Sequence, residues 1–394
     1  MDKKFATQQK YFDLFTKDFL PNPTPKYHEV ELKRGIKTVY IKDFPIESIK
    51  LKRSPYIVFI IFAKLLNFKF LGRWEKTLWE IPVLYKGIPF MLSHRKFGFQ
   101  FTSFQKGANL TKLAKEAIKN IDNAIPFAEQ LFQEEIKQKV IDGRISLSNE
   151  YRPIKERYDF FRRKAAAIYK KMNFPTPTGD ALRDYEMLIM QNLLTPPEAS
   201  FYTVAMLDAF FSLLEHSLVL IIPFLNHGFP ENNNLEQFIG MNWKGKYQYV
   251  FSKSDPKTVA HQLNALIDIK EEYRNPISHG HFHKNGNSFN VHMENLGAIP
   301  MSLSKNRGNL SYGFKLPGDK EFKQICNVLD CFDDFIAKNK ETKYGIQYIK
   351  TGFIVAFDKS SHEKYMDAMS SEKAFGNFLD YTSYQIESSA NMDW

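Results

Sequence analysis

The chain has 394 residues, of which 43% are hydrophobic and 15% aromatic, and it carries a formal net charge of +10. A chain of this length and composition can bury a sizeable core, which excludes disorder throughout and predicts two domains. The two cysteines, Cys326 and Cys331, form no CxxC pair, and a chain this long does not depend on one disulfide, which excludes a disulfide-stabilised scaffold.

The N-terminal residues lack the apolar core of a secretory signal, and together with the cysteine content this predicts a reducing, cytoplasmic location. Residues 201–225 are long and apolar enough to suggest a membrane span. Asp208, Glu215 and His216 interrupt them, and each charge at the centre of a bilayer costs roughly 2.5–3.5 kcal/mol. We therefore expect a buried helix and no membrane partner, with membrane contact as the alternative.

The positive charge is concentrated in the first half of the chain. Residues 1–200 hold 35 Lys and Arg against 22 Asp and Glu, whereas residues 201–394 hold 19 against 22. This asymmetry indicates an anionic partner, most often nucleic acid, although a solubilising surface gives the same balance. Basic and aromatic residues also interleave over residues 94–101. They could clamp single-stranded RNA or form one face of a packed hairpin.

The first half is expected to hold a small sheet followed by helices. Residues 78–104 read as strands, with a hairpin around Gly87. Apolar residues then recur at helical spacing over residues 110–140, and a densely basic helix follows over residues 158–172. No family is recognised for residues 1–195.

The second half is predicted to be mainly helical. The apolar helix over residues 201–225 comes first, and a second helix runs from about residue 256 to 273 behind Asp255, a plausible N-cap. A third helix covers residues 319–338. A strand-like stretch, residues 344–357, then precedes a polar tail.

These elements predict an α+β fold in three parts. Prolines and a glycine over residues 175–198 indicate a domain boundary. Residues 1–195 are expected to form a basic, mixed N-terminal domain, and residues 196–343 an α-helical bundle with a small β-hairpin. Residues 344–394 are expected to supply the strand-like segment and the tail.

The most informative motif runs from Arg274 to His279 at the end of the second helix. Pro276 lacks an N–H group and disfavours α geometry at Asn275, so the regular helix should kink or stop there, and Gly280 supplies a flexible exit. Arg presents a permanently charged fork to phosphate oxygens, and His exchanges a proton near neutral pH. This combination suits phosphate chemistry.

The motif resembles the signature of HEPN superfamily ribonucleases, an Arg followed by a polar residue and then by a His four to six residues after the Arg. Arg274, Asn275 and His279 match these three positions. HEPN domains are compact helical bundles with the motif at the end of a late helix, behind a long apolar helix like residues 201–225. The resemblance covers roughly residues 198–340.

The resemblance implies metal-independent cleavage of RNA without a cofactor, in which the 2′-hydroxyl of the substrate attacks the neighbouring phosphorus. It gives His279 a role in proton transfer, Arg274 a role in stabilising the phosphate charge, and Asn275 a supporting role. HEPN sites are composite, and one motif is visible in this chain, so the resemblance implies a homodimer. By analogy it also suggests a toxin or antiphage setting, with an antitoxin or regulatory partner.

The apolar helix contributes a further candidate. Asp208, Ser212 and Glu215 lie four and three residues apart and so share one helix face. HEPN sites often include an acidic residue from this helix that orients the motif, and we expect Glu215 rather than Asp208 to do so. The alternative is that this stripe simply faces water. The neighbouring His216 is expected to be structural.

A hairpin is expected directly after the motif, around the Asn-Gly turn at residues 285–286. The predicted pairing sets Phe282 opposite Phe289 and places His281 and His283 on one face, where they could contact substrate. With the motif histidine they spell His-x-His-x-His, which could hold zinc, but no cysteine or nearby carboxylate completes a ligand set. We therefore predict no metal site; ordinary hairpin surface is the other alternative.

The predicted function is thus an RNA-cleaving enzyme. Two alternatives remain open at this stage. A non-catalytic HEPN-like module could bind RNA or nucleotide through Arg274 and the basic half, or the helical domain could merely dimerise.

Overall fold

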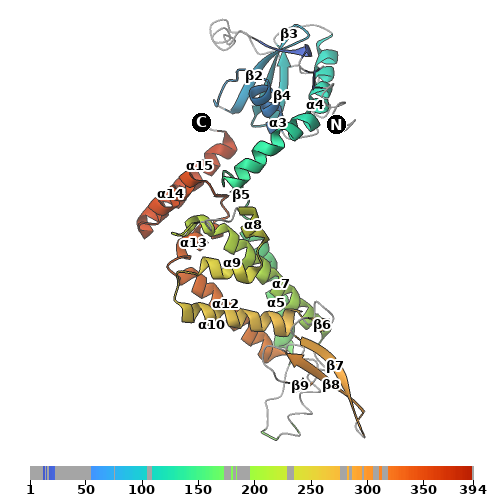
Figure 1. Ribbon diagram of the computed structural model, residues 1–394, viewed down its shortest axis with the longest axis vertical. Coiled ribbons are helices and arrows are strands. Elements are labelled where there is room, and N and C mark those ends of the chain that lie inside the picture. Colours follow the sequence, from blue (N-terminus) through green and yellow to red (C-terminus); the bar gives the residue numbers. More distant parts are fainter. Residues whose placement is uncertain are drawn as a thin grey trace. The chain divides into compact units, whose positions relative to one another are not determined.

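The computed structural model describes residues 12–13, 15, 17–22, 55–74, 76–103, 109–172, 179–180, 183, 196–228, 235–275, 282–283, 286–294, 297–304, 310–312 and 318–392. The chain divides into two compact units, which we call unit 1 (Met1–Lys139 and Phe378–Trp394) and unit 2 (Val140–Asn377). Unit 1 carries a four-stranded antiparallel sheet and unit 2 is mainly helical (Figure 1). The predicted α+β class is confirmed.

The sheet of unit 1 follows the chain, in the order β1-β2-β3-β4. Its strands are β1 (Phe19–Pro21), β2 (Thr77–Tyr85), β3 (Ile88–Arg95) and β4 (Gly98–Ser103). The hairpin between β2 and β3 turns at Lys86 and Gly87, both with positive φ, as the sequence predicted. The long helix α4 (Leu110–Ile141) buries Ala117 and Ile121 in the same core as the sheet (Figure 1). The short strand β1 was missed because three residues show no alternation.

Unit 2 is built around α7 (Pro197–Leu220), which is buried over most of its length. It is the one described helix long and apolar enough to cross a membrane, and 67% of its most apolar window is buried inside the protein, as in the core helix of a soluble protein. The helices around it are α5 (Tyr151–Lys171), η3 (Ile222–Phe224), α8 (Leu235–Gly240), α9 (Trp243–Val250), α10 (Pro256–Ile269), η4 (Lys270–Arg274), α12 (Asp319–Lys338), α13 (Lys343–Lys350), α14 (Lys359–Ala368) and the first part of α15 (Glu372–Asn391).

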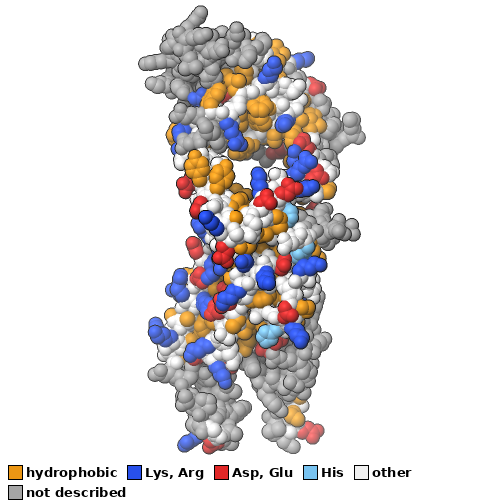
Figure 2. Space-filling view, turned by 90° about the vertical axis from the view of Figure 1, so that its left-hand side faces the viewer, with side chains coloured by type: hydrophobic (Ala, Val, Ile, Leu, Met, Phe, Trp, Pro, Cys, Tyr) orange, Lys and Arg blue, Asp and Glu red, His pale blue; other side chains and the backbone are white. Residues whose placement is uncertain are grey.

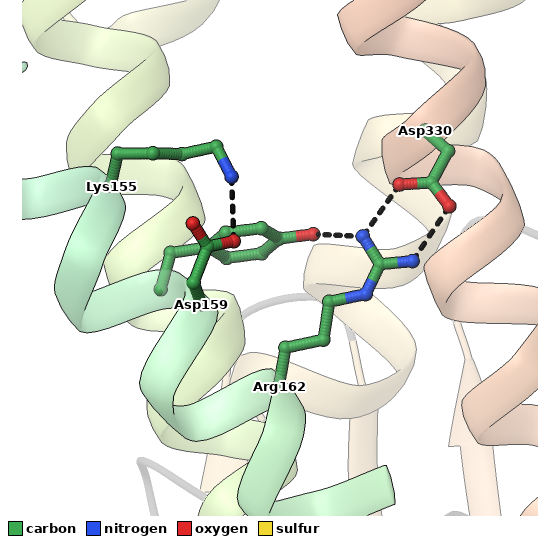
Figure 3. Close-up of polar contacts among 5 residues, drawn as sticks. Lys155, Asp159, Arg162 and Asp330 are labelled. Carbon is green, nitrogen blue, oxygen red and sulfur yellow. Dashed lines mark hydrogen bonds and ion pairs between the residues drawn. The ribbon is translucent and has the colours of Figure 1, made fainter.

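Helix α5 is held in unit 2 by packing against α7 and by polar contacts to α12. Arg162 donates two hydrogen bonds to the carboxylate of Asp330, of 2.5 and 2.6 Å, and a third of 2.8 Å to the hydroxyl of Tyr158 (Figure 3). The hydrogen bonds from Arg162 lower the pKa of Asp330. Tyr158, Ala165 and Tyr169 of α5 are buried. These contacts tie residues before and after the Pro-rich stretch into one core.

The predicted domain boundaries are therefore wrong. The units divide between Lys139 and Val140, within α4, and not near residues 175–198. The proline-containing stretch falls inside unit 2, whereas the buried residues of α5 decide where that helix belongs. In the sequence, the many basic residues of α5 obscure its few buried positions.

The predicted strand over residues 344–357 is also wrong. Most of it is helix α13 followed by the two-residue strand β10 (Val355–Ala356), which pairs with β5 (Ser146–Leu147), and the predicted polar tail is helical, in α14 and α15. The β-prone Tyr and Ile side chains of α13 are buried at helical spacing. At Gly345 a Cβ atom would lie 2.6 Å from a side-chain carbon of Ile221, so this close approach of α13 to the core requires glycine.

The segment after the motif forms a four-stranded antiparallel meander rather than a single hairpin. Its strands are β6 (Phe282–His283), β7 (Gly286–Met293), β8 (Gly297–Ser304) and β9 (Leu310–Tyr312). The predicted register is wrong by two residues, since Phe282 pairs with Asn287 and not with Phe289. Because His283 already pairs with Gly286, the connection is centred one residue earlier than the Asn-Gly turn that we expected.

Helix α12 places one carboxyl group, that of Asp333, at a cavity of about 20 Å³ whose lining includes Tyr151, Ser217 and Lys350. This volume is enough for about one water molecule. Burial raises the pKa of Asp333, against the opposing effect of Lys155 and Lys350. The charged carboxylate is therefore a cost to the folded state at neutral pH.

Replacing Asp333 by Asn should stabilise the protein at neutral pH. The folded state binds the Asp333 proton more tightly than the unfolded state does, so stability falls as the pH rises through the unfolded and then the folded pKa. Asp333→Asn removes this loss and should raise the free energy of unfolding at pH 7.5 by about 1 kcal/mol. The gain should shrink toward about pH 4, near the ordinary carboxyl pKa. Urea unfolding at both pH values measures it.

Asp334→Asn is the matched control, because Asp334 neighbours Asp333 on the same helix, but its side chain is 71% exposed and forms a surface ion pair with Lys338. It should change stability little at either pH. An Asp333→Asn variant no more stable than the wild type at pH 7.5 contradicts the assignment.

Candidate functional site

The site begins with the polar stripe on α7. Ser212 donates a hydrogen bond of 2.8 Å to the carbonyl oxygen of Asp208 one turn earlier, so its hydroxyl is occupied by its own helix. The carboxylates of Asp208 and Glu215 are each 46% exposed. Helices α9 and η4 pack against α7 and supply a cationic partner to each carboxylate.

Arg274 is fixed by the first of these carboxylates. Its Nε donates to Oδ1 of Asp208 at 2.8 Å, and its Nη1 donates to Oδ1 of Asn275 at 3.2 Å. Among the described residues, none accepts a hydrogen bond from Nη2, and the side chain is 31% exposed. The guanidinium is therefore oriented by two contacts, and within the described part of the chain its Nη2 edge meets no acceptor.

The irregular helix end predicted at the motif is present, but it takes an unexpected form. Helix α10 ends at Ile269 and continues as the π-helical turn η4, and Asn275 keeps helical torsion angles (φ −67°, ψ −44°). The expected departure from α geometry at Asn275 is therefore wrong: the distortion lies upstream, in the wider π-helical turn before Pro276. Such turns inside helices are frequent at functional sites. The Asp255 N-cap of α10 is confirmed by its hydrogen bond to the Thr258 N–H.

Glu215 has a different partner from the one expected. Its carboxylate accepts a hydrogen bond of 2.6 Å from Nζ of Lys246, whose side chain is only 3% exposed. The preference for Glu215 over Asp208 as the residue that orients the motif is therefore corrected, since Asp208 bonds Arg274. The two acids share one helix face, and only the positions of α9 and η4 decide which cation each one meets.

Further charged and aromatic residues near Arg274 were not singled out from the sequence. Lys270 places its ammonium 4.8 Å from the ring centroid of Phe211 and 5.1 Å from that of Trp243. Lys244 approaches Glu271 at 3.9 Å. The spacing of Lys270 from Arg274, four residues on one helix, is a signal that could have been noticed. The aromatic partners come from two other helices and left no local signal.

The histidines of the predicted site are only partly accounted for. His279 and His281 lie outside the described residues, and of His283 only the strand position in β6 is described. Their roles stay predictions. His216 accepts a hydrogen bond of 2.9 Å from the Glu150 N–H, and burial lowers its pKa, which fits the structural role expected for it. Within the described parts of the chain, no group of three His, Cys, Asp or Glu side chains is arranged to hold a metal ion.

Comparisons with protein-family models, curated proteins and solved structures returned no match. The resemblance to HEPN ribonucleases therefore depends on the motif and its place at a helix end. On the described part of the face in Figure 2, Lys and Arg side chains are mixed with Asp and Glu side chains over the helical unit. The local cluster around Arg274 is the strongest candidate for binding an anion.

The contact between Glu215 and Lys246 should matter for folding. Glu215→Ala leaves the Lys246 ammonium buried without its partner and should lower the free energy of unfolding by about 1–3 kcal/mol. Glu215 is half-exposed, so the loss should stay below the roughly 3–5 kcal/mol of a fully buried pair. Adding Lys246→Met should recover part of it. Urea unfolding of the single and double variants measures both effects.

Glu198→Ala removes an exposed acid from the first turn of the same helix and serves as the control, with an expected change within about 0.5 kcal/mol. If Glu215→Ala is as stable as Glu198→Ala, the contact between Glu215 and Lys246 contributes nothing to stability.

Proposed function

We propose that the protein is a metal-independent endoribonuclease of the HEPN type. The observation that carries this proposal is the state of Arg274, which is anchored at Nε and Nη1 and leaves Nη2 without a described partner. A guanidinium is always charged, and its planar fork matches the oxygens of a phosphate group. Because the anchoring contacts exist before any ligand binds, the donor needs little reorganisation to meet charge that develops during a reaction.

The proposed reaction is transesterification within the RNA. The 2′-oxygen forms a bond to the adjacent phosphorus while the bond from phosphorus to the 5′-oxygen breaks. The 2′-hydroxyl gives its proton to a base and the departing 5′-oxygen receives one, so the products are a 2′,3′-cyclic phosphate and a 5′-hydroxyl. His279 is proposed to take part in these proton transfers, and Arg274 to stabilise the extra negative charge on the phosphate oxygens.

Other residues and a second copy of the chain would complete the proposed site. Asn275 supports Arg274 through its side-chain oxygen. Asp208 orients Arg274 by accepting the hydrogen bond from its Nε, and His281 and His283 are proposed contacts to RNA. One Arg-Asn-x3-His motif is visible in the chain, so a composite site requires a homodimer. A toxin or antiphage role in the cytoplasm, with an antitoxin or regulatory partner, remains an analogy with the family.

The test compares the wild type with Arg274→Ala and His279→Ala on total cellular RNA in the presence of EDTA. The wild type should cleave RNA and leave 2′,3′-cyclic phosphate ends, because no metal takes part. Each variant should lower the rate by about 10² or more, since each removes a group that acts on the reacting phosphate. An RNA with 2′-O-methyl groups should remain intact, because it lacks the attacking hydroxyl.

Arg144→Ala is the matched control, because the Arg144 side chain is 70% exposed and contacts Asp142 only at 3.9 Å. It should cleave like the wild type. Cleavage that requires added metal, or that survives in both site variants, contradicts the proposal. Salt-sensitive binding of RNA without cleavage by the wild type indicates instead the non-catalytic module.

A further inference from the structure

The side chain of Lys270, one turn before Arg274, packs against two aromatic rings. Its ammonium lies over the rings of Phe211 from α7 and Trp243 from α9, at 4.8 and 5.1 Å from their centroids. The two rings are themselves buried and meet edge to face, with centroids 5.4 Å apart. Attraction between a cation and aromatic faces holds such a side chain in one position. The charge of Lys270 is therefore placed by three elements of unit 2.

The charged groups around Lys270 leave it without a counter-ion of its own. Asp208 and Glu215 face it from α7, Lys244 from α9 and Arg274 from its own helix. Burial lowers the pKa of Lys270, and Arg274 and Lys244 add to this effect while the two acids oppose it. Both acids are already bonded to other cations. Among the described residues, no carboxylate forms an ion pair with Lys270.

The position of Lys270 relative to Arg274 suggests that its charge binds an anion. Residues four apart on a helix present their side chains on the same face. Two cations on one face repel each other unless an anion lies between or beside them. Packing against aromatic rings alone does not require a charge, because an apolar side chain would fill the same space at a lower desolvation cost.

We propose that Lys270 is a second substrate-binding residue of this site, whose ammonium contacts the phosphate backbone of the RNA beside the phosphate held by Arg274. This inference rests on the proposed function for the identity of the ligand. It goes further by naming a residue outside the recognised motif and by giving it a phosphate contact. Arg274 supplies the directional fork, and Lys270 supplies a compact charge that tolerates variation in backbone position.

The test measures binding of a 2′-O-methyl RNA oligonucleotide, which cannot be cleaved, by fluorescence anisotropy between 50 and 200 mM KCl. Lys270→Met keeps an unbranched chain against the two rings and removes the charge. Loss of one phosphate contact should reduce the slope of log affinity against log salt by about 0.7. Affinity at 100 mM KCl should fall roughly tenfold. Lys270→Arg should keep the wild-type slope.

Lys257→Met is the matched control, because Lys257 is exposed on the first turn of α10, which η4 continues, and it should bind like the wild type. Thermal melting checks that each variant is folded, and Lys270→Gln replaces Lys270→Met should the latter unfold. A wild-type slope in the charge-free variant overturns the inference, as does an equal loss in Lys270→Arg.

Because the oligonucleotide cannot be cleaved, this assay separates the two proposals. A wild type that never cleaves RNA contradicts the nuclease, whereas a reduced salt slope in Lys270→Met still supports Lys270 as a phosphate contact. A wild type that does not bind RNA at all overturns both.

Discussion

The structure of unit 2 depends on burying α7, a helix that is apolar on most sides but carries two carboxylates on one face. A carboxylate close to an apolar core is costly unless a cation and hydrogen bonds compensate it. Asp208 meets this requirement through Arg274 and Glu215 through Lys246. The contacts that allow α7 to serve as the core helix therefore also fix the helices η4 and α9, and with them the candidate site.

This arrangement explains why the site keeps positive charge. Each carboxylate of the stripe is taken by one cation, so neither is left to neutralise Lys270. Arg274 is bonded at Nε and Nη1, which orients the guanidinium and leaves its Nη2 edge for another acceptor. The π-helical turn carries both residues, and the rings of Phe211 and Trp243 hold Lys270 in place. An anionic ligand would compensate the positive charge of Lys270 and Arg274.

The sequence predicted elements whose periodicity is strong, such as the strands over residues 78–104 and the helix α12, because alternation and helical spacing are local signals. It failed for α13, where β-prone side chains are buried at helical spacing. The prolines after α5 suggested a domain boundary there, but α5 packs against α7 and so belongs to unit 2. The sequence could not show whether Asp208 or Glu215 bonds Arg274, since both acids lie on one face of α7. Lys270 was missed because its ring partners come from other helices.

The most direct test of the central claim is a crystal structure of the protein with an uncleavable 2′-O-methyl RNA. We expect a phosphate oxygen at about 2.7–2.9 Å from Nη2 of Arg274, a typical distance for a charge-assisted hydrogen bond, with Asp208 still bonded to Nε. RNA phosphates bound elsewhere, with the Nη2 edge covered by another part of the protein, would contradict it.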